Sequence, residues 1–381
     1  MEDRIVIFTD GSRKILYNSI MILFSHTEAG PDSVDQIDLE DYKAAIVDVK
    51  NLEEGFEISG RIRSIRPDLP LLIINDFEKP ADRFFFTKIK GFGQIRILNM
   101  RRVGYEEELL ENTQNLLHPE YPSTKNDIAI ILPVYNEEKR FNYVYNFVRK
   151  LERLLEEAFI NATIYFVNDG SKDNTEKMVQ MLLKEHSDRT EYVSRGFIAA
   201  QNLSMNTRKA GTYIEGIRTI DADILLFVDA DDSFVIDDIA LMINILREGY
   251  YDMVVGSKDL TAENRPPLRR LLSFAKRLLT KSMLPKGVYD SQTGLKAMKS
   301  TTAKYIIPYL HMNTGLAIDL EILHLARKLD FRVLQIPVTC IDREGSHVDV
   351  VKDSIAFLKN IFRIRKNNKK VRIDSTEVKG K

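Results

Sequence analysis

The chain has 381 residues, more than one ordinary hydrophobic core accommodates, so we expect two domains. A composition of 44% hydrophobic and 29% charged residues is typical of globular proteins, and the net charge of −1 argues against general affinity for nucleic acid. The single cysteine excludes an intramolecular disulfide and a cysteine-based zinc site, and neither a signal peptide nor a transmembrane run is predicted.

Short apolar runs alternate with helical patterns over the first 118 residues. Such alternation predicts an α/β domain in which helices cover a parallel sheet. We expect strands at 5–8, 44–47, 71–74 and 95–98, and helices at 52–65 and 105–117. The polar segment 119–127 contains Pro122 and is the predicted linker to the next domain.

The order and spacing of these elements resemble those of response-regulator receiver domains, which have a flavodoxin-like fold. The resemblance implies a phosphoacceptor at Asp48, directly after the third apolar run. However, Asp10 stands alone where an acidic pair is usual, and Asn75 and Asn99 replace the usual hydroxyl and lysine residues. The first domain is therefore either a degenerate receiver-like scaffold or an active phosphoacceptor domain.

The second predicted domain, 128–350, repeats the alternation of strands and helices. We expect strands at 128–132, closed by Pro133, at 163–167, near Tyr192, and at 224–228. Helices are expected at 139–159, up to residue 183, and after Lys209. This pattern again predicts a mostly parallel sheet.

Three of these strands end in polar clusters. The clusters follow the strands at residues 133–138, 168–175 and 229–232. Because the carboxyl ends of parallel strands meet at one edge of a sheet, we expect the clusters to form one ligand site. Asp229 and Asp231 can bind a hard divalent cation that prefers oxygen ligands; taken alone, this acidic segment is equally compatible with a solvated turn.

In order and spacing these clusters resemble those of the family 2 glycosyltransferases, which have the Rossmann-like GT-A fold. The resemblance implies Mg²⁺ or Mn²⁺ at Asp229 and Asp231. It also implies a nucleotide-sugar site that consists of Pro133, Tyr135, Asn136, Glu137, Asn168, Asp169, Lys209, Asp229, Ala230 and Asp231. Many family members have Asp at the position of Asn168, so the base preference stays open.

The C-terminal half resembles the dolichyl-phosphate sugar synthases, in the segments 290–296, 319–323 and 343–347. The nearest patterns are those of the dolichyl-phosphate β-glucosyltransferases, followed by the mannose synthases. The resemblance favours UDP-glucose as donor, with GDP-mannose second, and a polyprenyl (dolichyl) phosphate as acceptor. It implies that Arg343, Ser346 and His347 bind the acceptor phosphate, and Arg265 is a further candidate.

Two segments combine apolar and basic residues in a helical pattern. Residues 268–284 have an apolar face opposite five basic residues, which is typical of helices on a membrane surface. The C-terminal segment 351–381 carries ten Lys or Arg and three Asp or Glu, and it predicts a second amphipathic helix followed by a flexible tail. We expect a peripheral protein on the cytoplasmic face of a membrane, bound directly or through a membrane-protein partner.

The expected reaction is an inverting transfer of a hexose from a nucleotide sugar to a polyprenyl phosphate. Asp229, Asp231, Arg343 and Arg265 are the candidate catalytic residues, and the role of Asp232 stays open. One alternative is a family 2 transferase that acts on a glycan or protein hydroxyl and uses a catalytic base. The other is a signalling or scaffold protein with a non-catalytic sugar-nucleotide module.

Overall fold

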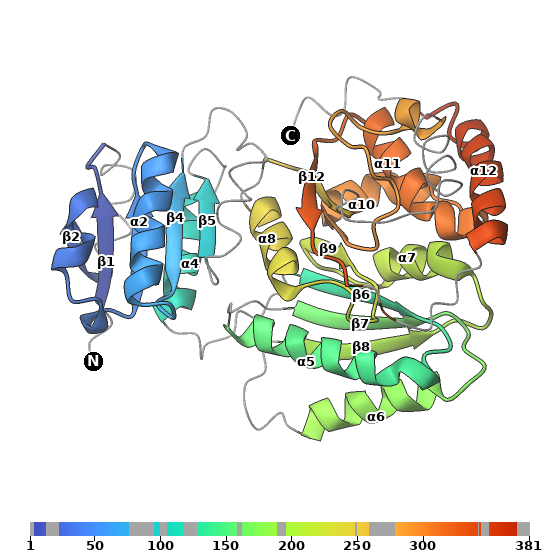
Figure 1. The fold of residues 1–381 in the computed structure, drawn as a ribbon, viewed down its shortest axis with the longest axis horizontal. Helices are drawn as coiled ribbons and strands as arrows, with labels where there is room; N and C mark the ends of the chain where they lie inside the picture. The colour runs from blue at the N-terminus through green and yellow to red at the C-terminus, as the bar shows by residue number, and fades with distance from the viewer. Residues whose placement is uncertain are drawn as a thin grey trace.

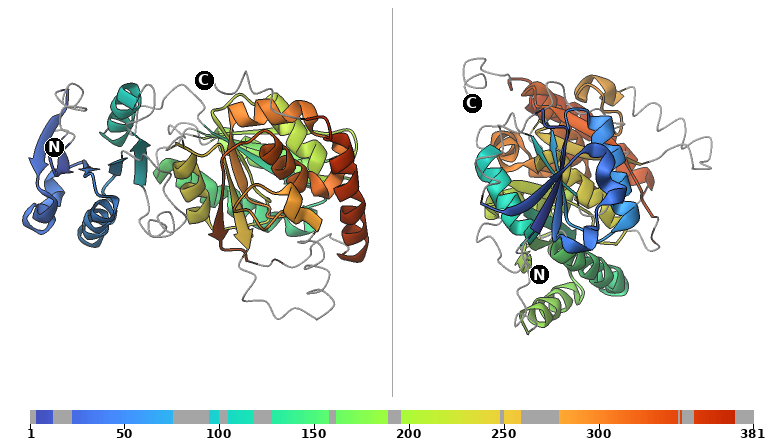
Figure 2. Two further views of the ribbon diagram at one scale, coloured as in Figure 1. Left: turned by 90° about the horizontal axis from the view of Figure 1, so that it is seen from above. Right: turned by 90° about the vertical axis from the view of Figure 1, so that its left-hand side faces the viewer.

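Two separate sheets organise the chain in the computed structural model (Figures 1 and 2). The structure describes residues 4–12, 23–75, 95–99, 105–117, 128–157, 162–188, 196–247, 250–258, 279–341, 343 and 350–371. The predicted linker, 119–127, lies outside these ranges. On either side of it, the last described helix of the first unit ends at Leu117 and the second sheet begins at Ile128.

The first sheet is entirely parallel, with strand order β2-β1-β3-β4-β5. Its strands are β1 (Arg4–Thr9), β2 (Ser25–Ala29), β3 (Ala44–Asp48), β4 (Leu71–Asn75) and β5 (Ile95–Asn99), with helices α2 (Leu52–Ile65) and α4 (Tyr105–Leu117). The predicted α/β organisation is confirmed here. Strand β2 was not predicted because its sequence, Ser-His-Thr-Glu-Ala, has no apolar run and lies at the sheet edge.

The second sheet has the order β12-β10-β11-β9-β6-β7-β8. Its strands are β6 (Ile128–Val134), β7 (Ala162–Asn168), β8 (Gly196–Asn202), β9 (Ile224–Phe227), β10 (Met253–Lys258), β11 (Lys296–Lys299) and β12 (Val333–Val338). Only β11 runs antiparallel to its neighbours, so the predicted mostly parallel sheet is confirmed.

Helices cover both faces of this sheet (Figure 1). They are α5 (Phe141–Glu157), α6 (Thr175–Asp188), α7 (Arg208–Thr219), α8 (Ile236–Arg247), α10 (Ser300–Ile306), α11 (Ile318–Lys328) and α12 (Val350–Asn367). Short 3-10 helices are η1 (Pro31–Gln36), η2 (Leu39–Asp41), η3 (Glu138–Arg140), η4 (Lys281–Met283), η5 (Ile307–Tyr309) and η6 (Met312–Ala317). Alternate residues of β6 point to opposite faces: Ile130 packs in the core with α5 and α8, whereas Ile131 packs in the core with α7 and α11.

One strand boundary differs from the prediction, because β6 continues through Pro133 to Val134, in parallel register with β7. Strand β8 is described over Gly196–Asn202, and Tyr192, near which a strand was expected, lies outside the described residues. The three strands that end in polar clusters, β9, β6 and β7, are direct neighbours in the sheet. The fold therefore brings the three clusters together, as the sequence predicts.

The chain beyond β12 returns to the acidic segment that follows β9. Phe234 and Cys340 form an antiparallel β-bridge, and the backbone N–H of Ile341 donates to the carbonyl of Ser233 at 2.8 Å. These contacts place Arg343 beside the 229–232 cluster, although more than one hundred residues separate them in sequence.

The C-terminal helix α12 is part of the protein core. Phe357, Ile361 and Ile364 are buried against the cluster that contains α7 and α11. Among the large apolar residues of 356–367, the part of this helix with described side chains, only Phe362 is highly exposed, at 62%. The predicted second helix is confirmed, and its apolar face packs inside the domain. Within the parts of the chain that the structure describes, no helix is long and apolar enough to cross a bilayer.

Residues 268–278 of the other predicted amphipathic segment lie outside the described residues. Its last part is described, and there Met283 and Leu284 are buried while Leu279 packs against the same core. The exposed side chain of Arg365 on α12 donates to the carbonyl of Leu279 and to Ser282 Oγ, both at 2.8 Å. The end of this segment is thus anchored to α12.

Substitutions at two adjacent positions of α12 test whether this helix is part of the protein core. We expect Ile361→Ala to lower the free energy of unfolding by about 2–5 kcal/mol, since it removes a fully buried side chain and leaves a cavity. Phe362→Ala, the matched control, should change it by less than about 0.5 kcal/mol because that ring is exposed. Urea denaturation of the full chain measures both, and equal effects would contradict the packing described.

Candidate functional site

The loops after β6 and β7 are hydrogen-bonded to each other. The backbone N–H of Asn136 donates to Ser171 Oγ at 2.9 Å, and Asn136 Oδ1 accepts from the backbone N–H of Lys172 at 2.9 Å. The N–H of Glu137 donates to Thr175 Oγ1 at 2.7 Å. These hydrogen bonds therefore hold the predicted nucleotide-binding residues of the two loops together at the carboxyl end of the sheet.

Asn168, at the end of β7, uses both functions of its amide. Its Nδ2 donates to Asn202 Oδ1 at 2.9 Å, and its Oδ1 accepts from the backbone N–H of Ser171 at 3.2 Å. The side chain is almost fully buried. An aspartate could not donate to Asn202. The amide of Asn168 therefore links β7 to β8 and also holds Ser171 in the loop that follows β7.

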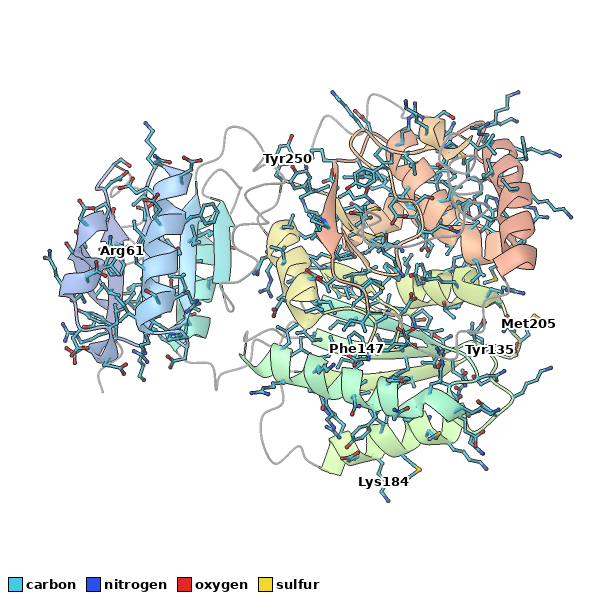
Figure 3. The ribbon with its side chains drawn as sticks, in the orientation of Figure 1. Arg61, Tyr135, Phe147, Lys184, Met205 and Tyr250 are labelled. Carbon is cyan, nitrogen blue, oxygen red and sulfur yellow. The ribbon has the colours of Figure 1, made fainter. Side chains whose placement is uncertain are left out.

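Asp169 links the same loop to the start of α7. Its Oδ1 accepts from the backbone N–H of Thr207 at 2.6 Å and from Thr207 Oγ1 at 2.7 Å. Burial raises the pKa of Asp169, and the hydrogen bonds from Thr207 oppose that shift. Gly170 has φ +66, and a Cβ there would lie 2.7 Å from the carbonyl carbon of Met205, so the close approach of the two loops requires glycine. Figure 3 labels Tyr135 and Met205 at this end of the sheet.

Positive φ angles at non-glycine residues also mark these loops. Within the described ranges four such residues occur. Asn136 and Asp232 lie in the loops that follow β6 and β9, and Arg208 is the first residue of α7, directly after the loop that follows β8. A non-glycine residue in this conformation is strained, and such residues concentrate at functional sites. The backbone thus identifies the same sheet edge as the polar side chains do.

Asp229 and Asp231 lie just beyond β9, separated by the buried Ala230. The Asp229 side chain is 41% exposed, and its Oδ1 accepts from Lys209 Nζ at 2.8 Å. Asp231 is half-buried and accepts from the backbone N–H of Ser233 at 3.2 Å. The backbone of Gly294 packs directly on the Asp229 carboxylate, since a Cβ there would lie 1.9 Å from Oδ2.

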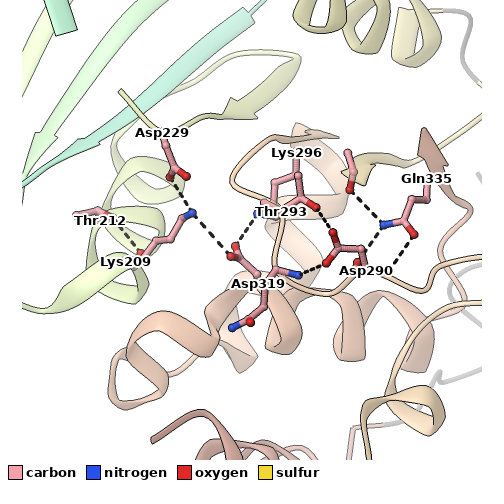
Figure 4. A network of polar contacts seen from close by, with 10 residues as sticks. Lys209, Thr212, Asp229, Asp290, Thr293, Lys296, Asp319 and Gln335 are labelled. Carbon is pink, nitrogen blue, oxygen red and sulfur yellow. Dashed lines mark hydrogen bonds and ion pairs between the residues drawn. The ribbon is translucent and has the colours of Figure 1, made fainter. Parts of the chain in front are cut away.

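Lys209 belongs to a row of alternating charges that consists of Asp229, Lys209, Asp319 and Lys296 (Figure 4). Its Nζ lies 3.8 Å from Asp319 Oδ2, and Asp319 Oδ1 is 2.6 Å from Lys296 Nζ. Burial lowers the pKa of Lys209, but Asp229 and Asp319 outweigh it and raise that pKa well above its usual value. Burial lowers the pKa of Lys296, against the attraction of Asp319. Both ammonium groups lie over the ring of the buried Tyr213, at 5.3 and 5.4 Å from its centroid.

Asp319 and Lys296 were not among the predicted site residues. The sequence signal was present, because both lie in the C-terminal segments, 319–323 and 290–296, that carry the family resemblance. Their pairing could not be derived from spacing, since β11 supplies Lys296 and α11 supplies Asp319.

A second charge cluster surrounds Asp232, which is buried and has φ +56. Lys150 Nζ on α5 lies 2.7 Å from each carboxylate oxygen, and Arg343 donates to Oδ2 at 2.7 Å. The guanidinium of Arg343 also donates to the backbone carbonyl of Asp232 and lies over the ring of Tyr143. The predicted residue Arg343 is therefore at the site, bound to the neighbour of Asp231.

Some predicted residues are not placed at the site. Arg265, Ser346 and His347 lie outside the described residues. Asp48 ends β3 in the first sheet and is completely buried. A phosphodonor cannot reach a carboxylate that has no exposed surface, so this geometry argues against the predicted phosphoacceptor.

The residues at this site fit a divalent cation that would be held partly by the protein and partly by the oxygens of a bound diphosphate. Among the described residues, no three His, Cys, Asp or Glu side chains come together as metal ligands. Asp229 and Asp231 nevertheless offer two partly exposed carboxylates at the end of one strand. Mg²⁺ is commonly held by one or two carboxylates, with substrate phosphates and water as further ligands.

Most of the site lies within a match to a known protein family. Residues 129–303 match the family model of glycosyl transferase family 2. Over 249 residues the chain is 29% identical to a dolichyl-phosphate beta-glucosyltransferase of Dictyostelium discoideum, which covers 62% of this chain and 73% of that protein. It is 26% identical over 241 residues to the human protein of the same name, covering 59% and 71% of the two chains.

Two solved structures superpose on part of the chain. Glucosyl-3-phosphoglycerate synthase from Mycobacterium tuberculosis, solved with Mn²⁺, UDP-glucose and phosphoglyceric acid, superposes with a TM-score of 0.45 at 13% identity and covers 65% of this chain and 82% of its own. Mannosyltransferase PcManGT from Pyrobaculum calidifontis has a TM-score of 0.41 at 17% identity and covers 59% of each chain. By the family match, residues 129–303 of the chain form a glycosyl transferase family 2 domain.

Proposed function

We propose that the protein transfers glucose from a nucleotide sugar to a polyprenyl phosphate, with inversion at the anomeric carbon. The observation that carries the proposal is the cluster at the ends of β9, β6 and β7, where Asp229 and Asp231 face the loops of Asn136 and Asp169. The names of the relatives supply the glucose and the dolichyl phosphate.

The residues of the site suit a nucleoside diphosphate as leaving group. In this proposal the loops that contain Tyr135, Asn136 and Asp169 hold the nucleoside, and Lys209 orients the Asp229 carboxylate. Bound at Asp229 and Asp231, Mg²⁺ or Mn²⁺ would neutralise the negative charge that develops on the leaving diphosphate. Arg343 is near enough to pair with an acceptor phosphate, and Arg265, Ser346 and His347 stay candidates for that role.

The surroundings of Asp232 favour a phosphate acceptor over a hydroxyl acceptor. A transferase that acts on a hydroxyl needs a base to take up its proton. Asp232 is a candidate beside Asp231, but Lys150 donates to both of its carboxylate oxygens and Arg343 donates to one, so these cations occupy the positions from which a base would accept a proton. A phosphate monoester has its second pKa near about 6 and is mostly dianionic at neutral pH, so it needs no base.

A radiolabelled transfer assay tests the proposal directly. We expect label from UDP-glucose, and less or none from GDP-mannose, to enter a polyprenyl phosphate in the presence of Mg²⁺ or Mn²⁺. Asp229→Asn and Asp231→Asn should each lower kcat at least about a hundredfold, because each removes a carboxylate that would hold the cation against the leaving diphosphate. Asp237→Asn, an exposed aspartate in the first turn of α8, should retain full activity.

Other outcomes of this assay identify the alternatives. Metal-dependent release of nucleoside diphosphate without lipid label would favour the transferase that uses a glycan or protein hydroxyl. Binding of UDP-glucose without turnover of any donor would favour the non-catalytic sugar-nucleotide module.

We further propose that the first domain is a receiver-like scaffold that does not accept phosphate. The parallel strand order 2-1-3-4-5 supports the receiver-like part, since flavodoxin-like folds share it. The complete burial of Asp48 supports the second part. In addition, Asp10 Oδ2 accepts from the backbone N–H of Lys50 at 2.9 Å, which closes the loop after β3 over the edge of the sheet.

Incubation with acetyl phosphate and Mg²⁺ should therefore give no phosphoryl adduct in intact-mass spectrometry. The Asp48→Asn variant serves as the comparison. An adduct that forms on the wild-type protein and not on this variant would identify Asp48 as a phosphoacceptor and overturn the scaffold proposal.

For localisation we propose peripheral attachment to the cytoplasmic face of a membrane, directly or with a membrane-protein partner. The support is the outward face of α12, where Lys359, Phe362, Arg363 and Lys366 recur at helical spacing and are exposed. Basic residues attract anionic lipid, and an exposed aromatic ring suits the headgroup region.

Co-sedimentation with vesicles measures this attachment. The protein should bind phosphatidylserine-containing vesicles more strongly than phosphatidylcholine vesicles. Each Lys near an anionic surface contributes about 1 kcal/mol, so Lys359→Glu/Lys366→Glu should weaken binding by at least about thirtyfold. Charge reversal at Lys304, an exposed lysine on α10, is the control. Equal loss in both variants would show general electrostatics and not a surface on α12.

A further inference from the structure

The ion pair between Lys296 and Asp319 is fully enclosed, unlike the other contacts of the site. Both side chains are nearly inaccessible, at 2% and 4% exposure, and their charged atoms are 2.6 Å apart. Lys296 Nζ also donates to the carbonyl of Thr293 at 2.7 Å. Burying two charges removes both from water, which is expensive, and well-packed apolar residues are often as stabilising. Stability alone therefore does not explain the pair.

The position of Asp319 gives it a second role. Its other oxygen, Oδ2, faces Lys209 Nζ at 3.8 Å, while the same ammonium is 2.8 Å from Asp229 Oδ1. Lys209 thus lies between two carboxylates, one partly exposed at the metal site and one buried (Figure 4). A divalent cation at Asp229 would repel the ammonium, and Asp319 is the carboxylate toward which Lys209 can move.

We propose that Asp319 and Lys296 are positioning residues that set the affinity of Asp229 for a divalent cation, by controlling how strongly Lys209 competes for that carboxylate. The inference rests on the proposed metal site at Asp229 and Asp231. Asp319 attracts Lys209 away from Asp229, and Lys296 limits that attraction because it shares the charge of Asp319.

The two single substitutions then have opposite effects on metal binding. Asp319→Asn removes the second partner of Lys209, so the ammonium stays on Asp229 and Mn²⁺ should bind about tenfold more weakly. Lys296→Met leaves Asp319 to Lys209 alone, so Asp229 is released and Mn²⁺ should bind more tightly by a similar factor. The double variant removes the buried pair as a unit and should bind Mn²⁺ within about threefold of the wild type.

The chain offers a matched control on the same helix. Glu321 on α11 is also a completely buried carboxylate, but it accepts from His311, Thr314 and Asn368. Residues two positions apart on a helix do not share a face. Glu321→Gln should lower the thermal stability and leave the Mn²⁺ affinity unchanged.

The experiment is a titration of the full-length chain with Mn²⁺ at saturating UDP, followed by electron paramagnetic resonance of free Mn²⁺, with thermal unfolding of each variant beside it. Opposite shifts for Asp319→Asn and Lys296→Met, with recovery in the double variant, are expected. The inference would be overturned if both single variants bound Mn²⁺ more weakly, or if the Mn²⁺ affinity of each variant changed in parallel with its thermal stability. Either result would show that the pair of Lys296 and Asp319 has only a structural role.

The wild-type titration separates this inference from the proposal on which it rests. Absence of Mn²⁺ binding by the wild type would refute the metal site, and the positioning role with it. Normal binding by the wild type, with no difference among the variants, would refute the positioning role alone.

Discussion

Through its ion pairs with Asp229 and Asp319, Lys209 links distant elements of the second domain. Asp229 follows β9 in the middle of the sheet, while Lys209 lies in the first turn of α7 on one face and meets Asp319 from α11. Because an ammonium in this partly dry position is stable only with carboxylates around it, α7, β9, β11 and α11 must assemble together. The position of the metal-binding carboxylate is thus determined by contacts that extend well into the core.

The second charge cluster neutralises a buried carboxylate, Asp232, on the other side of Asp231. Asp232 adopts a left-handed backbone conformation and points into the protein, where an unpaired carboxylate would be strongly destabilising. Lys150 from α5 and Arg343 from the segment after β12 neutralise it. The β-bridge between Phe234 and Cys340 holds that segment in place, so the order of the acidic loop depends on a late part of the chain.

The sequence predicts those parts of the fold and the site that have a local cause. Helices α2 and α4 were placed to the residue, and the polar ends of β6, β7 and β9 were expected at one edge because parallel topology requires it. Strand β2 has no apolar signal, and Lys296 pairs with Asp319 only through tertiary packing, so neither could be derived. Helix α12 was predicted, but the sequence does not tell what its apolar face meets, because a basic amphipathic pattern is the same whether that face meets lipid or the protein core.

The charges of the site also couple the binding of its two ligands. Asp229, Asp231 and Asp232 face Lys209, Lys150 and Arg343, and the buried pair Lys296–Asp319 adds no net charge, so these groups balance. A divalent cation alone would leave two unbalanced positive charges in a partly desolvated pocket. A nucleoside diphosphate alone would leave roughly two unbalanced negative charges there. Each ligand therefore removes the electrostatic cost of the other. Since binding coupling is reciprocal, the cation should raise the affinity for the diphosphate by the same factor as the diphosphate raises that for the cation. A pocket balanced in this way holds the metal and the diphosphate together more tightly than it holds either alone.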